Sequence, residues 1–210
     1  MKQGTEVLMD IQYLPSIAWY QAAVKAGKLE LEQWEHYQKV SYKNRCWVAG
    51  ANGRVMLSVP LEKGKGQRTL MKDVKLSYKE RWNVQHWRTL ESNYRRSPYF
   101  EYLEADFRQL YERQFVFLMD MNLQFMEVIN RILGFEPEMK LTEVYRKEPE
   151  TGMLDLRAAF RPSDQEQPSG EGLPAYQQVF EDRTGFLPNL SIADLLFCEG
   201  RHGFELLKGA

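Results

Sequence analysis

The sequence lacks most of the features that mark secreted, membrane-spanning or redox-active proteins. Only two cysteines occur among its 210 residues, Cys46 and Cys198, and they are far apart with no CxxC pair. No segment approaches the roughly 20 apolar residues of a membrane span, and the opening MKQGTEVLMD has no long apolar run behind a basic segment. We therefore expect a reduced, cytoplasmic protein with two free thiols, no signal peptide and no membrane span.

Charge of one sign and the familiar catalytic motifs are also missing. Lys and Arg number 28 against 29 Asp and Glu, which gives a formal net charge of -1. No global basic field is expected to attract nucleic acid or anionic lipid. Nucleic-acid binding is a distant third interpretation, which rests on the aromatic and basic residues of YRRSPYF. The three histidines show no zinc-ligand spacing, and the Walker A, GxSxG, HExxH and GxGxxG patterns do not occur.

The apolar content is high enough for a packed core. Hydrophobic residues make up 43% of the chain and aromatic residues 13%, which argues against wholesale disorder. We expect a single domain over residues 1–210. It would comprise an α/β sheet part (1–78), a helical part (79–160), a polar loop (161–174) and C-terminal helices (175–210).

The N-terminal part predicts a strand-helix-strand unit. Val7–Ile11 is an apolar run of strand length, and Ile17–Ala26 has a helical pattern that ends at Gly27. LELEQW, from Leu29, alternates apolar and acidic residues as a half-buried strand does. Such a unit favours a right-handed crossover between two parallel strands.

A β-hairpin is expected next. Cys46–Ala49 and Arg54–Val59 flank the sequence GANG, whose Asn-Gly pair is a strong hairpin signal. A further strand is expected at Asp73–Ser77. The predicted fold class is therefore α/β: a small mixed sheet, made of the strand-helix-strand unit and the hairpin, packed with a helical C-terminal two-thirds.

Helical spacing dominates the middle of the chain. Helices are predicted at Arg81–Tyr94, Pro98–Tyr111 and Phe115–Leu133, with Ser97 as an N-cap before Pro98 and Gly134 as the end of the third helix.

Two short amphipathic helices are predicted after the polar loop, at AYQQVF and LSIADLLF. Ser191 would start the second as an N-cap, with Asp194 in a weak capping box.

The segment from His36 to Arg45, HYQKVSYKNR, is the densest candidate for a ligand site. It combines tyrosine faces for stacking, a lysine point charge and an arginine fork, which together suit a sugar or a nucleotide. The alternative is an exposed loop whose tyrosines cover the edge of the sheet.

Two further segments are candidates. In EKGKGQR, the backbone amides near Gly64 and Gly66, with Lys63, would cradle a phosphate, although most such loops are solvated turns. QYLPSIAWY follows the first strand, where open α/β sheets commonly receive ligands; alternatively, its aromatic residues only pack.

His86 is the candidate catalytic residue. It shares a helix face with Trp82 and Asn93 and would act as a general base near neutral pH. The alternative is a structural histidine between two tryptophans.

Five segments together resemble the WbqC-like family in order and approximate spacing: QYLPSIAWY, HYQKVSYKNRCWVAGANG, LSVPLEKGKG, WNVQHWRTLESNYRRSPYFEY and LPNLSIADLLF. Members of this bacterial family often lie in surface-polysaccharide or O-antigen gene clusters. The resemblance implies a transferase acting on an activated, phosphate-bearing donor such as a nucleotide sugar. The alternative is a non-catalytic binding or scaffold protein that uses the same groove.

The resemblance, taken with the residue types, implies a set of site residues. The ligand-binding candidates are Tyr13, Pro15, Tyr37, Gln38, Lys39, Tyr42, Asn44, Arg45, Lys63 and Tyr94. His86 is the catalytic candidate, no metal ligand is predicted, and the cofactor is left unknown. Convergence of Lys39, Arg45, Lys63 and His86 on one concave pocket would favour the enzyme, whereas scattering them would favour the binding protein.

Overall fold

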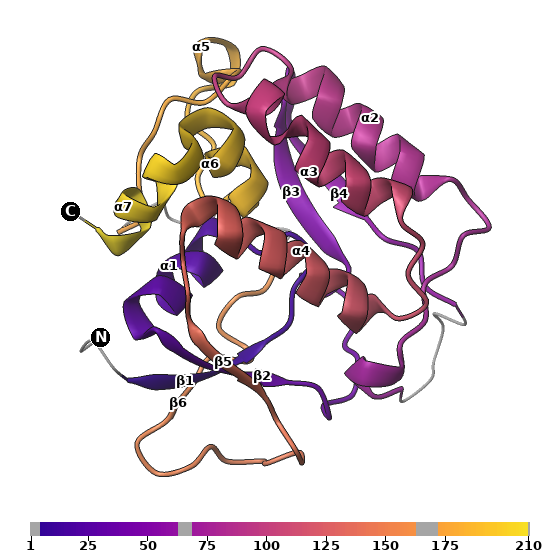
Figure 1. Cartoon of the computed structure of the whole chain (residues 1–210), viewed down its shortest axis with the longest axis vertical. Helices are drawn as coiled ribbons and strands as arrows, with labels where there is room; N and C mark the ends of the chain where they lie inside the picture. Colours follow the sequence, from indigo (N-terminus) through magenta and orange to yellow (C-terminus); the bar gives the residue numbers. More distant parts are fainter. Residues whose placement is uncertain (1–4, 63–68, 163–171, 210) are drawn as a thin grey trace.

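The computed structural model describes residues 5–62, 69–162 and 172–209 of the chain. Its elements are β1 (Glu6–Asp10), α1 (Ile17–Ala26), β2 (Lys28–Glu32), β3 (Arg45–Gly50), β4 (Gly53–Ser58), η1 (Met71–Asp73), α2 (Trp82–Tyr94), α3 (Phe100–Glu112), α4 (Leu118–Leu133), β5 (Glu138–Leu141), β6 (Leu154–Asp155), α5 (Glu181–Thr184), α6 (Ile192–Glu199), η2 (Gly200–His202) and α7 (Gly203–Lys208). Figure 1 shows β1, β2, β5 and β6 at one end of the molecule and the pair β3 and β4 beside α2 and α3.

The larger sheet is parallel. Its strand order is β5-β2-β1-β6, and each neighbouring pair runs in the same direction. The predicted parallel pair of β1 and β2, joined through α1, is confirmed. Helix α1 has its predicted bounds because Ser16 accepts a hydrogen bond from the Trp19 amide at one end and Gly27 takes a φ of 75° at the other. Strands β5 and β6 were not predicted.

Strand β2 is not half-buried as its alternation predicts. Every residue after Lys28 is buried. Its two leucines join the hydrophobic core. Glu30 pairs with Arg146, in the connection between β5 and β6, and Glu32 pairs with Arg157, just after β6. The charged face of β2 is therefore covered by polypeptide, and its charges are compensated by arginine.

The hairpin is confirmed. Strands β3 and β4 pair antiparallel from Arg45↔Ser58 to Gly50↔Gly53. Gly53 in the turn has a φ of 112°, a conformation that favours glycine. The α/β fold class is thus confirmed, with its parallel and antiparallel strands in two separate sheets.

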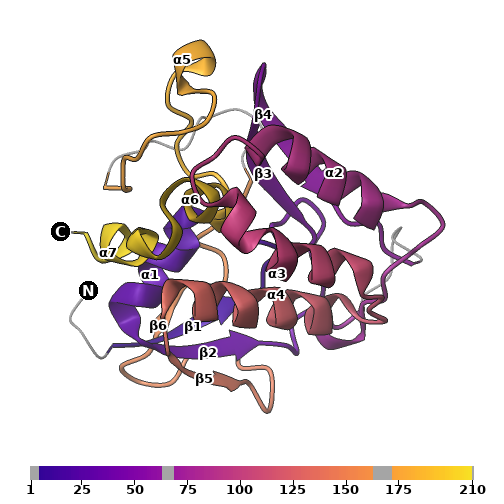
Figure 2. The same cartoon turned by 45° about the horizontal axis from the view of Figure 1, so that its top comes forward.

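The helices lie in layers over the two sheets. Figure 2 shows α1 and α4 over the parallel sheet and α2 and α3 towards the hairpin. Helix α6 fills the centre, where it contacts α1, α3, α4 and β3, and its residues 192–198 are all buried. One cluster of buried hydrophobic residues extends from β1 to α7.

The prediction of a strand at Asp73–Ser77 is wrong. It begins in η1 and continues as isolated bridges, Leu61 with Leu76 and Lys75 with Phe117. The same segment also shortens the third predicted helix, since the Leu118 amide donates to the Val74 carbonyl and α4 starts at Leu118 rather than at Phe115.

Ser97 is not an N-cap. Its hydroxyl donates to the carbonyl of Tyr94 at 2.6 Å, at the end of α2, and α3 begins only at Phe100. The Ser-Pro pair therefore closes one helix and turns the chain before the next.

The C-terminal predictions are half correct. Ser191 caps α6 as predicted, with its hydroxyl accepting from the Ala193 amide. The segment AYQQVF is not helical, because Tyr176 and Gln178 direct their side chains to Asp194. Asp194 accordingly binds side chains across the core and forms no capping box.

Asp194 is a buried carboxyl group with neutral donors. It accepts hydrogen bonds from Tyr94, at 2.6 Å, and from Tyr176 and Gln178. Burial raises its pKa to about 6, because these hydrogen bonds offset only part of the desolvation. The folded protein therefore holds a proton between about pH 4 and pH 6 that the unfolded chain releases, so this group's contribution to stability falls as the pH rises.

Replacing Asp194 with Asn should remove that pH dependence. The difference in unfolding free energy, wild type minus Asp194→Asn, should decrease by about 2 kcal/mol between about pH 4 and pH 7. Urea denaturation across this range measures it, with Asp182→Asn on exposed α5 as the control. A difference that stays constant with pH would contradict the buried titration.

Candidate functional site

Three strands of the parallel sheet end in acidic residues, β1 at Asp10, β2 at Glu32 and β6 at Asp155. Their carboxyl ends meet at one edge, and the order β5-β2-β1-β6 puts a topological switch point beside β1, where open α/β sheets bind ligands. A pocket of about 480 Å³ opens at this edge. It is lined by Glu35, Gln38, Tyr145, Asp155, Arg157, Ala158, Ala159 and Arg161.

A buried ion cluster lies beside this pocket. The ammonium group of Lys43 is 2.7 Å from Oε1 of Glu35 and 3.3 Å from Oδ2 of Asp10. Gln12 donates from Nε2 to the Asp10 carboxylate at 3.1 Å, and Asn122 donates to the Lys43 carbonyl at 2.8 Å. We call Lys43, Asp10, Glu35 and Gln12 the Lys43 cluster. It joins the end of β1 to the chain before β3 and to α4.

Burial shifts the proton equilibria in this cluster. Desolvation raises the pKa of Glu35, Lys43 opposes the rise, and the nearby Asp10 and Glu32 carboxylates add to it. Desolvation also raises the pKa of Asp10. Burial alone would lower the pKa of Lys43, but its two carboxylate partners outweigh this and raise it. Glu35 is the member that lines the pocket, so a carboxyl group of raised proton affinity is available there for acid–base chemistry.

The two arginines of the pocket, Arg157 and Arg161, differ in whether their guanidinium groups have partners. The Arg157 guanidinium binds Asp155, Glu32 at 3.3 Å and the Arg146 carbonyl at 2.8 Å, so it is part of the pocket wall. Arg161 is exposed, and nothing within the described ranges forms a hydrogen bond or ion pair with it. Of the two arginines that line the pocket, Arg161 is therefore the one without a partner among the described residues.

His86, the predicted catalytic residue, lies in a closed aromatic cluster. Its Nδ1 is 3.0 Å from the hydroxyl of Tyr13, and that hydroxyl is 2.6 Å from the hydroxyl of Tyr111. The ring of Trp82 contacts the His86 ring edge-on. Burial lowers the pKa of His86 to about 4, although a hydrogen bond with the Ser58 backbone raises it slightly. The imidazole is therefore neutral near pH 7. Its catalytic role stays a prediction, and this packing favours the structural alternative.

The predicted HYQKVSYKNR site divides between surface and interior. The Tyr37 hydroxyl donates to Asn44 at 2.8 Å, and Asn44 donates to the Val59 carbonyl at 2.8 Å, which ties the segment to the end of the hairpin. Arg45 lies close enough to Tyr37 to lower its pKa, although burial raises that pKa more. Tyr42 is buried and accepts the Tyr13 amide through its carbonyl.

The remaining predicted residues lie elsewhere. The Pro15 carbonyl accepts the Ile192 amide, and the Tyr94 hydroxyl donates to Asp194 while it accepts the Ala49 amide.

Only one described member of the predicted set, Gln38, lines the pocket at the sheet edge. Lys39 is exposed, whereas Arg45 and His86 are not among the lining residues. Lys63 lies outside the described residues. Of the described cations in the predicted site, Lys39 and Arg45, neither lines this pocket.

Some residues near this pocket carried a sequence signal that the prediction did not use. Asp10 and Glu32 are acids at the ends of apolar strands, a position typical of ligand sites in parallel sheets. Lys43 lies inside YKNR, between residues that were chosen as ligands. Arg157 and Arg161 carried no signal, because the strand that brings them to the edge is too short to recognise.

Fold and pocket define an α/β protein with a polar, partly charged crevice at the carboxyl edge of a parallel sheet. The model of the WbqC-like protein family matches residues 11–161, and the chain belongs to this family. All the residues that line the crevice fall in the matched range, whereas the LPNLSIADLLF segment lies outside it. Comparisons with curated proteins and with solved structures gave no match.

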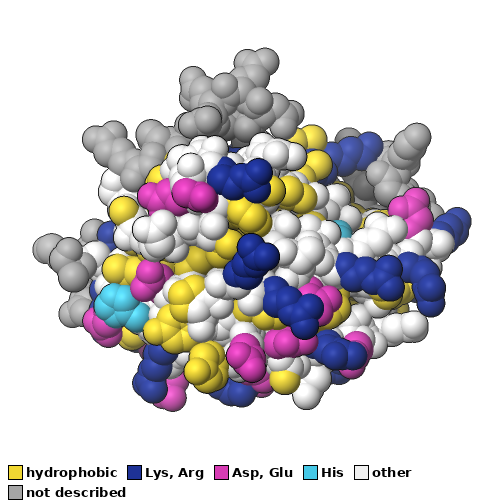
Figure 3. All heavy atoms as spheres, turned by 90° about the horizontal axis from the view of Figure 1, so that it is seen from above, with side chains coloured by type: hydrophobic (Ala, Val, Ile, Leu, Met, Phe, Trp, Pro, Cys, Tyr) yellow, Lys and Arg dark blue, Asp and Glu magenta, His cyan; other side chains and the backbone are white. Residues whose placement is uncertain are grey.

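Three general properties accompany this site. No helix in the described ranges is long and apolar enough to cross a membrane. Among the same residues, no group of three or more His, Cys, Asp or Glu side chains could hold a metal ion. On the face drawn in Figure 3, Lys and Arg side chains alternate with Asp and Glu, consistent with the balanced total charge.

The buried histidine gives a pH test of its environment. The folded protein keeps His86 neutral down to about pH 4, whereas the unfolded chain protonates it near pH 6.5, so stability is lost as the pH falls through this window. The difference in unfolding free energy, wild type minus His86→Gln, should therefore increase by about 3 kcal/mol from about pH 4 to pH 7. Urea denaturation measures it, with exposed His202→Gln as the control; equal pH profiles for wild type and His86→Gln would refute a buried, neutral His86.

Proposed function

We propose that the protein is a transferase that binds an activated, phosphate-bearing sugar or a related donor at the carboxyl edge of its parallel sheet. The observation that carries the proposal is that buried Glu35 and exposed Arg161 line the same pocket. Membership of the WbqC-like family and the resemblance described above support a place in surface-polysaccharide metabolism.

The exposed side chains of the pocket would each bind a different part of the donor. Arg161 presents a guanidinium that can bind two phosphate oxygens at once. Gln38 offers an amide to a sugar hydroxyl, and the ring of Tyr145, half exposed, offers a stacking face for a sugar or a base. Arg157 remains bound to Asp155 and Glu32 and supplies a fixed positive charge in the wall.

Glu35 is the proposed general base. As an acceptor hydroxyl or amine attacks the donor carbon, Glu35 takes its proton, and the bond from that carbon to the phosphate oxygen breaks, with the electron pair leaving on the phosphate. Arg161 stabilises the charge that develops on this leaving group. Lys43 keeps its pair with Asp10 throughout and holds the Glu35 carboxyl in position before the transfer.

The alternative is a non-catalytic binding protein that uses the same pocket. It is favoured by one specific observation: His86 is enclosed in the aromatic cluster rather than directed at the pocket. Under this alternative the donor binds but is not turned over.

Donor binding should depend on Arg161. Loss of charge-assisted hydrogen bonds in Arg161→Ala should weaken affinity by about tenfold or more, measured by calorimetry against nucleoside diphosphate sugars. Arg108→Ala, an exposed arginine on α3, is the control. If Arg45→Ala loses binding while Arg161→Ala keeps it, the ligand lies at HYQKVSYKNR and the pocket assignment is wrong.

Turnover should depend on Glu35. Glu35→Gln keeps the shape and removes the base, so kcat should fall by about 10²–10⁴-fold while donor affinity stays within about twofold. Turnover is assayed with the donor class found by calorimetry, after circular dichroism shows that the variant is folded. Donor binding without turnover by the wild type, across hydroxyl and amine acceptors, would support the binding protein instead.

A further inference from the structure

Strand β5 forms one edge of the parallel sheet, and its four residues are all exposed. The Glu138 amide donates to the carbonyl of Gly27, just before β2, and the Thr142 amide donates to Leu31 of β2. Backbone groups alternate in direction along a strand, so the N–H and C=O groups of Met139 and Leu141 point away from β2. Within the described ranges no strand pairs with this outer edge.

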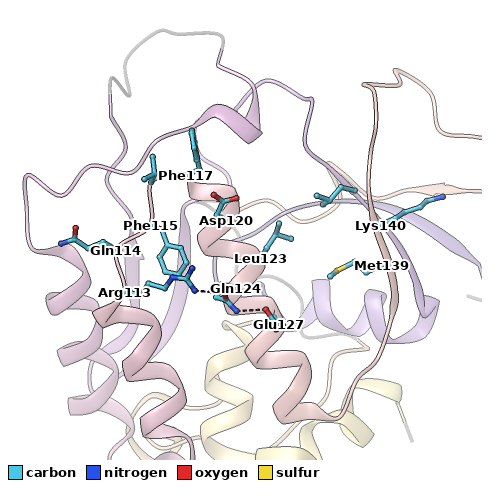
Figure 4. Close-up of a pocket in the computed structure, with 12 residues that line it drawn as sticks. Arg113, Gln114, Phe115, Phe117, Asp120, Leu123, Gln124, Glu127, Met139 and Lys140 are labelled. Carbon is cyan, nitrogen blue, oxygen red and sulfur yellow. Dashed lines mark hydrogen bonds between the residues drawn. The ribbon is translucent and has the colours of Figure 1, made fainter.

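The exposed edge borders a groove of about 680 Å³ between β5 and α4. Its lining combines apolar side chains with charged and amide ones, Lys140 of β5 among them. Figure 4 shows Phe115, Phe117 and Leu123 on one side of this groove and Met139 on the other. Met139 and Leu141 are 42% and 36% exposed, and neighbouring Val116 is 61% exposed. Unpaired strand edges beside exposed apolar side chains readily accept another strand.

The charges on β5 indicate which strand could pair with its outer edge. Across the sheet, one row of side chains alternates in sign, because Glu6 is opposite Lys28 and Lys28 is opposite Glu138. Glu138 already pairs with Lys28 and Lys140 with Glu6, each at 2.8 Å, but their side chains remain 75% and 57% exposed, so each can take a second partner. In an antiparallel pair of two β5 strands centred on Met139, Glu138 of each copy is opposite Lys140 of the other.

This register also suits the backbone. Met139 lies opposite its own copy, with outward N–H and C=O groups facing each other, and the Leu141 amide faces the Pro137 carbonyl. The Glu138–Lys140 pairs fall at the non-hydrogen-bonded positions, where side chains are closest. Centring the pair on Lys140 instead would place two lysines against each other at such a position.

We propose that a second copy of this chain pairs with β5, in an antiparallel twofold arrangement that joins the two parallel sheets into one continuous sheet. Met139 and Leu141 of both copies then lie on the groove side, and two Glu138–Lys140 pairs close the other face. Such an interface is isologous, with the same patch on both copies. The proposal is independent of the function proposed for the pocket.

Charge exchange tests the register. Wild type should sediment as a dimer at high-micromolar concentration, whereas Lys140→Glu and Glu138→Lys should each raise the dissociation constant by about tenfold or more, because like charges replace both pairs. The double variant Glu138→Lys/Lys140→Glu should return to near the wild-type constant. An equimolar mixture of the two single variants should form a heterodimer, because opposite charges again meet.

A backbone variant separates pairing from folding. Leu141→Pro removes an amide that points outward and leaves the amides that bind β2, so it should be folded by circular dichroism yet monomeric. A monomeric wild type overturns the proposal. A dimer that none of these substitutions weakens overturns this interface, and a monomer that instead binds an extended peptide of another protein overturns the assignment of a second copy.

Discussion

The buried ammonium of Lys43 is the interaction on which the rest of the site depends. It contacts Asp10 at the end of β1 and Glu35 beyond β2, while Asn122 on α4 holds its backbone. Removing one partner of a buried ion pair typically costs about 3–5 kcal/mol, because a desolvated charge is left behind. One cation therefore fixes the positions of both strand ends and of the carboxyl group that lines the pocket.

The chain leaving β1 separates two environments. Gln12 turns to the Lys43 cluster, whereas Tyr13, the next residue, turns to His86 and Tyr111 in the aromatic core. Successive side chains of an extended backbone point in opposite directions, so neighbouring residues serve a polar crevice and a dry core. Within QYLPSIAWY, Gln12 thus belongs to the Lys43 cluster, whereas the residues after it pack in the core and begin α1.

Prediction from the sequence was accurate where local signals were strong and failed where pairing decided the structure. Helix α1, the Asn-Gly hairpin and the cap at Ser191 each follow from residues within a few positions. Strands β5 and β6 are short and exposed, and they exist because β2 and β1 offer them partners. Similarly, the residues predicted from HYQKVSYKNR share a segment, yet their side chains go to a pocket, a hairpin contact and the interior.

Residue patterns along the chain were enough to predict the α/β class, most helices and the family, and composition established the balanced charge. Which polar residues meet depends on the tertiary structure. Parallel strand pairing and the return of the chain beside β1 bring Lys43 to Asp10 and Glu35, and place Arg161 in one pocket with Glu35. The tertiary structure also decided that His86 is neutral and enclosed, since desolvation depends on neighbours far along the chain. Periodicity reports which face of an element is apolar, whereas a site depends on which elements become neighbours.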